Sequence, residues 1–289
     1  MNKQRRKELR NIYEYIKGEQ YVKEIQKEPS VSNNMKDEME KNNISWKRVV
    51  MFFIIATLIS NIFRFDIFEF KSELEKLPSW IFIFITVLLE GSGVIIGALI
   101  IIPFLKKKRK MEMSLFGTSK SKSLIMAIIP ILILTIIGVT NDFGMEYHFY
   151  GLVAATGTFL YCIMEEYGWR GYLQEELKIL KPWKKYLIIG FIWYLWHLTF
   201  LTKASIGDNL FFLGMMIFGS WGIGQVAEST KSIIASACFH MIIQIMMFNA
   251  LIKNGIDGTE KIMILGVSIA IWFVIIKKWE KENTIANNV

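Results

Sequence analysis

The sequence predicts an all-α protein that crosses a membrane about eight times. Of its 289 residues, 53% are hydrophobic, and the charged 21% gather near the N-terminus and in short loops between long apolar runs. A soluble protein instead interleaves polar residues at helical spacing. Runs such as IIGALIIIPF and LIMAIIPILILTII lack the alternation typical of membrane β-strands. Because lipid offers the backbone no hydrogen-bond partner, we expect helices.

Each predicted span approaches the roughly 20 apolar residues that a helix needs to cross the hydrocarbon core. The predicted spans are 47–63, 80–104, 123–139, 150–173, 186–202, 209–227, 232–252 and 262–277. The last one is slightly short. We expect one membrane domain, 46–277, between a polar arm, 1–45, and a tail, 278–289. The arm is either a short amphipathic helix on the membrane surface or a solvated tail.

Basic residues alternate between loops in the pattern that sets membrane orientation. Residues 1–48 carry twelve Lys or Arg and loop 105–122 carries seven, whereas loop 140–149 carries none. The pattern predicts that both termini are cytoplasmic, and it accounts for the net charge of +8 without a nucleic-acid partner. The charged N-terminus shows no cleavable signal peptide. Cys162 and Cys238 both fall in predicted spans, so a disulfide framework is not expected.

Ionisable side chains inside the predicted spans are costly to bury, so each indicates a functional site. They are Glu90, Glu165, Glu166, Arg170, His197 and His240. Arg64 lies at a span end, where snorkelling of its side chain to the interface explains it. We interpret His148, in a predicted outer loop, as an ordinary interfacial residue.

The adjacent acids in the fourth span are predicted to play different parts. Glu166 and Arg170 are four residues apart, so their side chains share a helix face and can pair. Glu165 lies about 100° away around the helix and can face a different cavity. It then stays available as a general base. The alternative is that the acids only hold helices together through an ion pair.

Two histidines on separate helices are expected to meet Glu165. A lone histidine in an apolar helix is more often a packing group than a catalyst. However, at 1.5 Å per residue, Glu165, His197 and His240 all lie about 12 to 20 Å from the cytoplasmic ends of their spans. This common depth predicts one site in the cytoplasmic half of the bilayer.

Several catalytic motifs are absent. No H-E-x-x-H zinc-protease motif and no P-loop occur. The string EGSG lacks the leading glycine of the serine intramembrane protease motif, and SIGDN lacks the first glycine of the aspartyl motif.

The string EEYGWRG resembles the E-E-x-x-x-R signature of the CPBP intramembrane proteases, which include the CAAX prenyl endopeptidases and the bacterial Abi group. The family's second motif is an aromatic residue four positions before a histidine. Trp193 and His197 match it, although phenylalanine is commoner there. The third motif is a histidine four positions before an asparagine, and His240 matches it with Gln244 in place of the asparagine. The resemblance covers roughly residues 80–250.

The resemblance implies hydrolysis of peptide bonds within or near the membrane. Glu165 would be the general base that activates water, and His197 would orient that water or assist proton transfer. His240 and Gln244 would stabilise the oxyanion, whose charge develops only in the transition state. The amide of Gln244 can still donate a hydrogen bond. It reaches one methylene further, so activity is reduced unless a backbone shift compensates.

The resemblance also implies supporting and metal-binding parts. Glu166 and Arg170 would hold the helix geometry, and Trp193 would support the site. Glu165, His197 and His240 could bind zinc with an open position for water. A glutamate-and-water mechanism without metal uses the same residues, and we favour no obligate metal.

We expect an intramembrane endopeptidase acting on a membrane-associated peptide or protein, with a prenylated tail as one option. The Ile-, Lys- and Asn-rich composition suggests a bacterial plasma membrane, and hence roles such as bacteriocin self-immunity. A catalytically inactive scaffold or immunity protein of the same fold is the alternative that Gln244 favours. A proton-coupled transporter would use Glu90 and Glu165 as a relay. It predicts inverted repeats and broken helices, which the sequence does not show.

Overall fold

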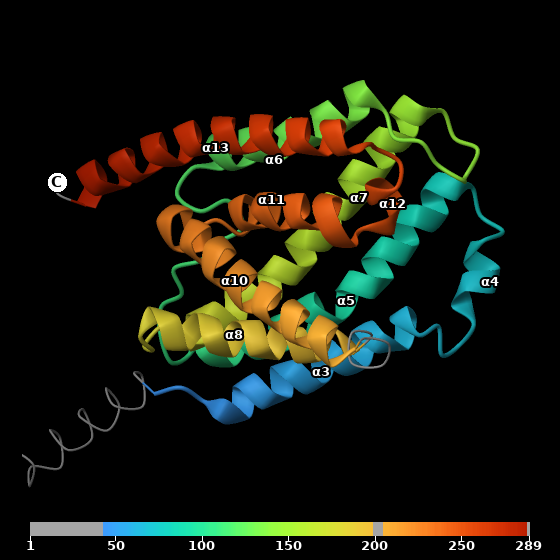
Figure 1. Cartoon of the computed structure of the whole chain (residues 1–289). Helices are drawn as coiled ribbons and strands as arrows, with labels where there is room; N and C mark the ends of the chain where they lie inside the picture. The colour runs from blue at the N-terminus through green and yellow to red at the C-terminus, as the bar shows by residue number, and fades with distance from the viewer. Residues whose placement is uncertain (1–42, 199–204, 288–289) are drawn as a thin grey trace, which may run out of the picture. The chain divides into compact units, whose positions relative to one another are not determined.

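The computed structural model describes residues 43–198 and 205–287, so the predicted polar arm lies almost entirely outside the described residues. The chain divides into the units Met1–Ile44 and Ser45–Val289, and every element below belongs to the second unit. In chain order (Figure 1), with η marking π-helical segments, the elements are α3 (Trp46–Arg64), α4 (Phe70–Leu74), α5 (Ser79–Lys106), α6 (Lys120–Ile137), α7 (Tyr147–Gly168), η1 (Trp169–Gln174), α8 (Pro182–Trp196), α10 (Ile206–Thr230), α11 (Ile233–Ile243), η2 (Gln244–Phe248), α12 (Ala250–Lys253) and α13 (Gly258–Asn287).

The all-α membrane class is confirmed. Within the described ranges the regular elements are helices, and an isolated bridge joins Ser114 to Ser232. Five helices there are long and apolar enough to cross a membrane, namely α3, α5, α6, α10 and the Gly258–Thr284 part of α13. A shorter apolar helix covers Ile233–Phe248. The count of eight spans stays a prediction.

Three predicted spans differ from the helices that form. The span 150–173 becomes α7 continued by the π-helical η1. The span 186–202 becomes α8, which begins at Pro182, where proline favours the first helical turn. After 15 residues, or about 22 Å, α8 ends at Trp196. The last span was slightly short in the sequence, yet it lies within a 30-residue helix that continues into the predicted tail.

Small residues let the helices approach closely. A Cβ atom on Gly93 of α5 would lie 2.5 Å from the carbonyl oxygen of Ala56 on α3. A Cβ atom on Gly190 of α8 would lie 2.5 Å from Cα of Ile217 on α10. Glycine at such positions permits backbone-to-backbone packing between membrane helices. The pairs α3–α5 and α8–α10 therefore form close contacts, and α8 and α10 lie side by side in Figure 1.

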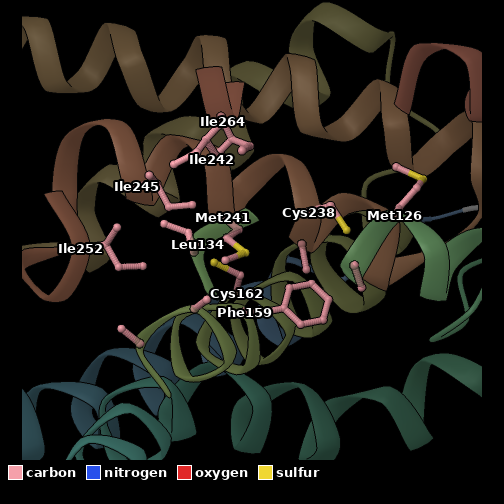
Figure 2. Close-up of a cluster of buried hydrophobic side chains, with 14 of the residues drawn as sticks. Met126, Leu134, Phe159, Cys162, Cys238, Met241, Ile242, Ile245, Ile252 and Ile264 are labelled. Carbon is pink, nitrogen blue, oxygen red and sulfur yellow. The ribbon is translucent and has the colours of Figure 1, made fainter. Parts of the chain in front are cut away.

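The main apolar core lies between α6, α7, α11 and α13 (Figure 2). Leu134, Cys162, Met241 and Ile264 contribute to it from these four helices, and each is fully buried. Cys162 and Cys238 are free cysteines within this core. The core fixes α7 against α11, which are the helices that carry the acidic pair and His240.

A buried carboxylate fastens three segments at the end of η1. Glu176 is fully buried and accepts hydrogen bonds from Arg48 Nε and Nη2, at 2.9 and 2.8 Å, and from the amide of Ser45 at 2.8 Å. Arg109 Nη2 donates to the carbonyl oxygen of Glu176 at 2.6 Å. The start of α3 and the loop after α5 are thereby tied to the segment that follows η1.

We expect Glu176→Gln to destabilise the protein by about 2 to 4 kcal/mol, because removing the buried carboxylate charge leaves two partly buried arginines uncompensated. Equilibrium unfolding in detergent micelles measures the loss. The control is Glu73→Gln, which breaks an exposed pair with Lys76 and should cost less than about 1 kcal/mol. Equal losses for the two variants would show that the buried network does not stabilise the fold.

Candidate active site

Glu165 lies near the end of α7 and is fully buried. Its Oε2 accepts hydrogen bonds from the indole nitrogens of Trp169, at 3.2 Å, and Trp193, at 3.1 Å. Its Oε1 is also buried and has no hydrogen-bond partner among the described residues. One oxygen of this carboxylate is therefore held by two donors, while the other retains its capacity to accept.

Glu166 pairs with Arg170, the charged partner that the helical spacing predicted. Arg170 Nε donates to Glu166 Oε2 at 2.8 Å, and both side chains are fully buried. Arg170 Nη1 also donates to the carbonyl oxygen of Ser220 at 3.2 Å. The pair therefore forms, and it connects η1 to α10 as well as to α7.

The other oxygen of Glu166 faces α11. His240 Nδ1 lies 3.0 Å from Glu166 Oε1, and His240 Nε2 lies 3.2 Å from Gln244 Nε2. With the proton on Nδ1, facing the carboxylate, Nε2 accepts a hydrogen bond from the amide of Gln244. Arg170, Glu166, His240 and Gln244 thus form a continuous polar chain, which we call the buried relay.

Trp193 on α8 contacts Glu165, His197 and His240. Its ring centroid is 5.0 Å from that of His240, with the rings nearly perpendicular, and its indole nitrogen bonds to Glu165. Its carbonyl oxygen lies 3.0 Å from Nδ1 of His197, the residue at which α8 ends. A carbonyl only accepts, so the contact favours the proton on Nδ1. Trp193 therefore touches all three residues that the sequence predicted to converge.

A cavity of about 400 Å³ adjoins this cluster. His197 and Gln244 line it, together with Tyr161, one turn before Glu165 on α7. Apolar side chains of α5, η2 and α12 form most of the remaining wall. Glu165 is not among the lining residues. The structure therefore opens two predicted site residues to the cavity and places Glu165 behind its wall.

The described residues contain no group of three His, Cys, Asp or Glu side chains that could hold a metal ion. The donor chemistry of His240 agrees with this, because its two ring nitrogens face Glu166 and Gln244. The alternative in which Glu165, His197 and His240 ligate zinc stays a prediction.

Sequence reasoning missed several side chains of the site. Trp169 lies four residues after Glu165, so helical spacing could have indicated their contact. Arg64 was explained by snorkelling, but the structure places it in the cavity wall. Tyr161 also lines the cavity and lacked any signal beyond its position one turn before Glu165.

Both π-helical segments begin beside the site. The first, η1, contains Arg170, and the second, η2, begins at Gln244. Widened turns of this kind often occur at functional sites because they re-aim side chains. After η2, Asn249 donates to Thr158 Oγ1 at 2.7 Å, which fixes this end of the cavity to α7.

We expect Trp193→Phe to destabilise the protein by about 1 to 3 kcal/mol, because it leaves a buried carboxylate with one donor fewer while keeping an aromatic ring. Equilibrium unfolding in detergent measures this loss. Trp183→Phe, at an exposed position, is the matched control and should leave stability nearly unchanged. If both variants unfold as the parent does, the indole hydrogen bond to Glu165 contributes nothing.

Comparison with known proteins adds a family assignment. Residues 146–246 match the family model described as type II CAAX prenyl endopeptidase Rce1-like. The matched segment contains the acidic pair, both site histidines and Gln244. No curated protein and no solved structure matches the chain. This segment, which holds the whole buried relay, supports the resemblance to the CPBP family of CAAX proteases.

Proposed function

We propose that the protein is an intramembrane endopeptidase that hydrolyses peptide bonds of a membrane-associated peptide or protein, using a water activated by Glu165. The observation that carries the proposal is the asymmetry of this buried carboxylate. Two indoles hold Oε2, and Oε1 has no hydrogen-bond partner among the described residues. A fixed carboxylate with one accepting oxygen suits a general base.

In the proposed reaction, a water bound at Glu165 Oε1 gives its proton to the carboxylate. The resulting hydroxide attacks the carbonyl carbon of the peptide bond, whose oxygen becomes an oxyanion. His197 lines the cavity, and its ring orients the water by accepting a hydrogen bond from the second O–H, which stays bonded to the attacking oxygen. When the C–N bond breaks, the protonated Glu165 returns its proton to the leaving amine. The base therefore begins and ends the cycle ionised.

In this proposal the buried relay positions the amide of Gln244 as a hydrogen-bond donor to the oxyanion. A glutamine amide has two N–H groups. In the tautomer described above, one of them bonds to His240, and the other remains for the cavity that Gln244 lines. In this proposal His240 is a positioning residue that acts through Gln244. We propose that the extra methylene of glutamine is accommodated by η2, the π-helical segment that begins at residue 244.

We propose no obligate metal. Chelation by EDTA or 1,10-phenanthroline should leave hydrolysis within about twofold of its starting rate, because catalytic zinc needs roughly three protein ligands that converge. The rate before and after dialysis against the chelator measures this. Loss of activity that added zinc restores would contradict the proposal.

A second candidate is a catalytically inactive protein of the same fold, such as a bacteriocin immunity protein. The observation that favours it is the position of Glu165 behind the cavity wall, since the site needs a path for water to reach Oε1. The purified Glu165, His197 and Gln244 variants described below decide between the two functions.

We further propose a bacterial plasma membrane as the location, with both termini cytoplasmic. The alternation of basic loops supports this orientation. Labelling of single cysteines introduced in the loops at residues 108 and 144, in intact cells, should modify only position 144. Equal labelling of both positions would contradict the orientation.

The catalytic proposal predicts that Glu165→Gln lowers the hydrolysis rate at least about 100-fold, the usual range for removal of a general base. His197→Ala and Gln244→Leu should also lower kcat, while Gln244→Asn should retain activity because it keeps the amide donor. Wild-type protein in vesicles is incubated with farnesylated and unmodified peptide libraries, and mass spectrometry identifies the products.

The matched control is Glu146→Gln, an acid at the N-terminus of α7 outside the site, which should cleave at the wild-type rate. Unfolding curves confirm that each variant is folded. If wild-type protein releases no product from either library, or if folded Glu165→Gln cleaves as fast as wild type, the peptidase proposal fails.

A further inference from the structure

Arg64, the last residue of α3, presents a charged group to the cavity wall. Its guanidinium carbon lies 4.1 Å from the ring centroid of Trp196. Its Nη1 donates to the carbonyl oxygen of Trp196 at 3.5 Å, and its Nη2 donates to the hydroxyl of Tyr161 at 3.4 Å. Both acceptors are neutral, and both contacts are long for hydrogen bonds.

Within the described part of the chain Arg64 forms no close ion pair with a carboxylate, although Glu90 lines the same cavity and attracts its charge from a distance. A guanidinium in a membrane span without a close counter-charge is expensive, and such residues usually face a cavity that a ligand enters. The stack on Trp196 holds the guanidinium plane, so its N–H groups are organised in advance for a planar, two-oxygen acceptor. A carboxylate is such an acceptor.

We propose that Arg64 binds a carboxylate of the substrate inside this cavity. This inference rests on the proposed peptidase function, which makes the ligand a substrate. It adds that the ligand carries a carboxylate. The carboxylate comes either from the C-terminus of a peptide or from an aspartate or glutamate side chain. Phe82, Val87 and Leu251 line the same cavity, so apolar side chains beside the carboxylate would be buried.

The position of Arg64 also limits where the carboxylate lies. Arg64 contacts the backbone of Trp196, and the next residue, His197, faces the same cavity. The bound carboxylate therefore lies close to the proposed scissile bond rather than at a remote site.

Glu90 restricts how many acidic groups the cavity accepts. It lines the cavity from α5, and in its ionised form it disfavours a second carboxylate. The cavity should therefore prefer a ligand with one acidic group among apolar ones. Replacing Glu90 by glutamine should then strengthen the binding of an acidic probe.

The experiment measures binding without hydrolysis. Glu165→Gln protein in lipid nanodiscs is titrated against four fluorescent apolar hexapeptides, and anisotropy gives each Kd. Two probes differ only in a C-terminal carboxylate or carboxamide. The other two both end in carboxamide and differ only in an internal aspartate or asparagine. The first pair tests the chain end as the source of the carboxylate, and the second pair tests a side chain.

At least one acidic probe should bind about tenfold more tightly than its amide counterpart, a difference of about 1.4 kcal/mol. Adding Arg64→Gln should bring this ratio close to one, and Arg64→Lys should retain part of it because the charge remains. Adding Glu90→Gln should raise acid binding severalfold. Lys184→Gln is the matched control, since the Lys184 ammonium lies over the ring of Trp183 and does not line the cavity, and the ratio should stay unchanged.

The proposal is overturned if neither acidic probe is preferred, or if the preference survives Arg64→Gln in a folded protein. If Arg64→Gln does not fold, Arg64→Lys and the expected gain from Glu90→Gln decide the question. The two proposals fail separately. Acid preference without hydrolysis by the wild type refutes only the peptidase, and hydrolysis without acid preference refutes only the role of Arg64.

Discussion

The fully buried ion pair between Glu166 and Arg170 is the constraint on which the rest of the site depends. Two charges removed from water are stable only when their remaining hydrogen-bonding groups find partners. Arg170 Nη1 donates to the carbonyl oxygen of Ser220, and Glu166 Oε1 lies 3.0 Å from His240 Nδ1, while Arg170 Nη2 has no hydrogen-bond partner among the described residues. Satisfying one pair therefore brings together α7, η1, α10 and α11, and it fixes the rotation of His240 and, through it, the side chain of Gln244.

The acids at 165 and 166 show how adjacent residues of one type acquire different chemistry. Glu166 faces an arginine and an imidazole, so its charge is compensated within the protein. Glu165 has neutral indole donors on one oxygen and no hydrogen-bond partner on the other among the described residues. Indole hydrogen bonds orient a carboxylate without supplying a counter-charge. The rotation of about 100° between consecutive helical residues creates this division.

The cavity follows a general pattern of ligand sites, in which an apolar wall carries a few polar groups that fix orientation. Here those groups come from distant parts of the sequence, with Arg64 from α3, Glu90 from α5 and His197 from the end of α8. The end of α8 at Trp196 matters for this arrangement. At this end the carbonyl oxygen of Trp193 accepts a hydrogen bond from the backbone N–H of His197 at 3.4 Å and also lies 3.0 Å from Nδ1 of its ring.

The sequence by itself determined the membrane class, the bounds of spans such as 47–63 and 80–104 to within a few residues, and the Glu166–Arg170 pair. These features depend on run length, which bilayer thickness sets, and on helical spacing, which is local. Only the tertiary structure decided that Trp193 bonds to Glu165, that His240 faces Glu166 and that Arg64 lines a cavity. The partners in these contacts are separated by 28 to 132 residues. The packing of whole helices determines whether they meet, and no local pattern encodes it.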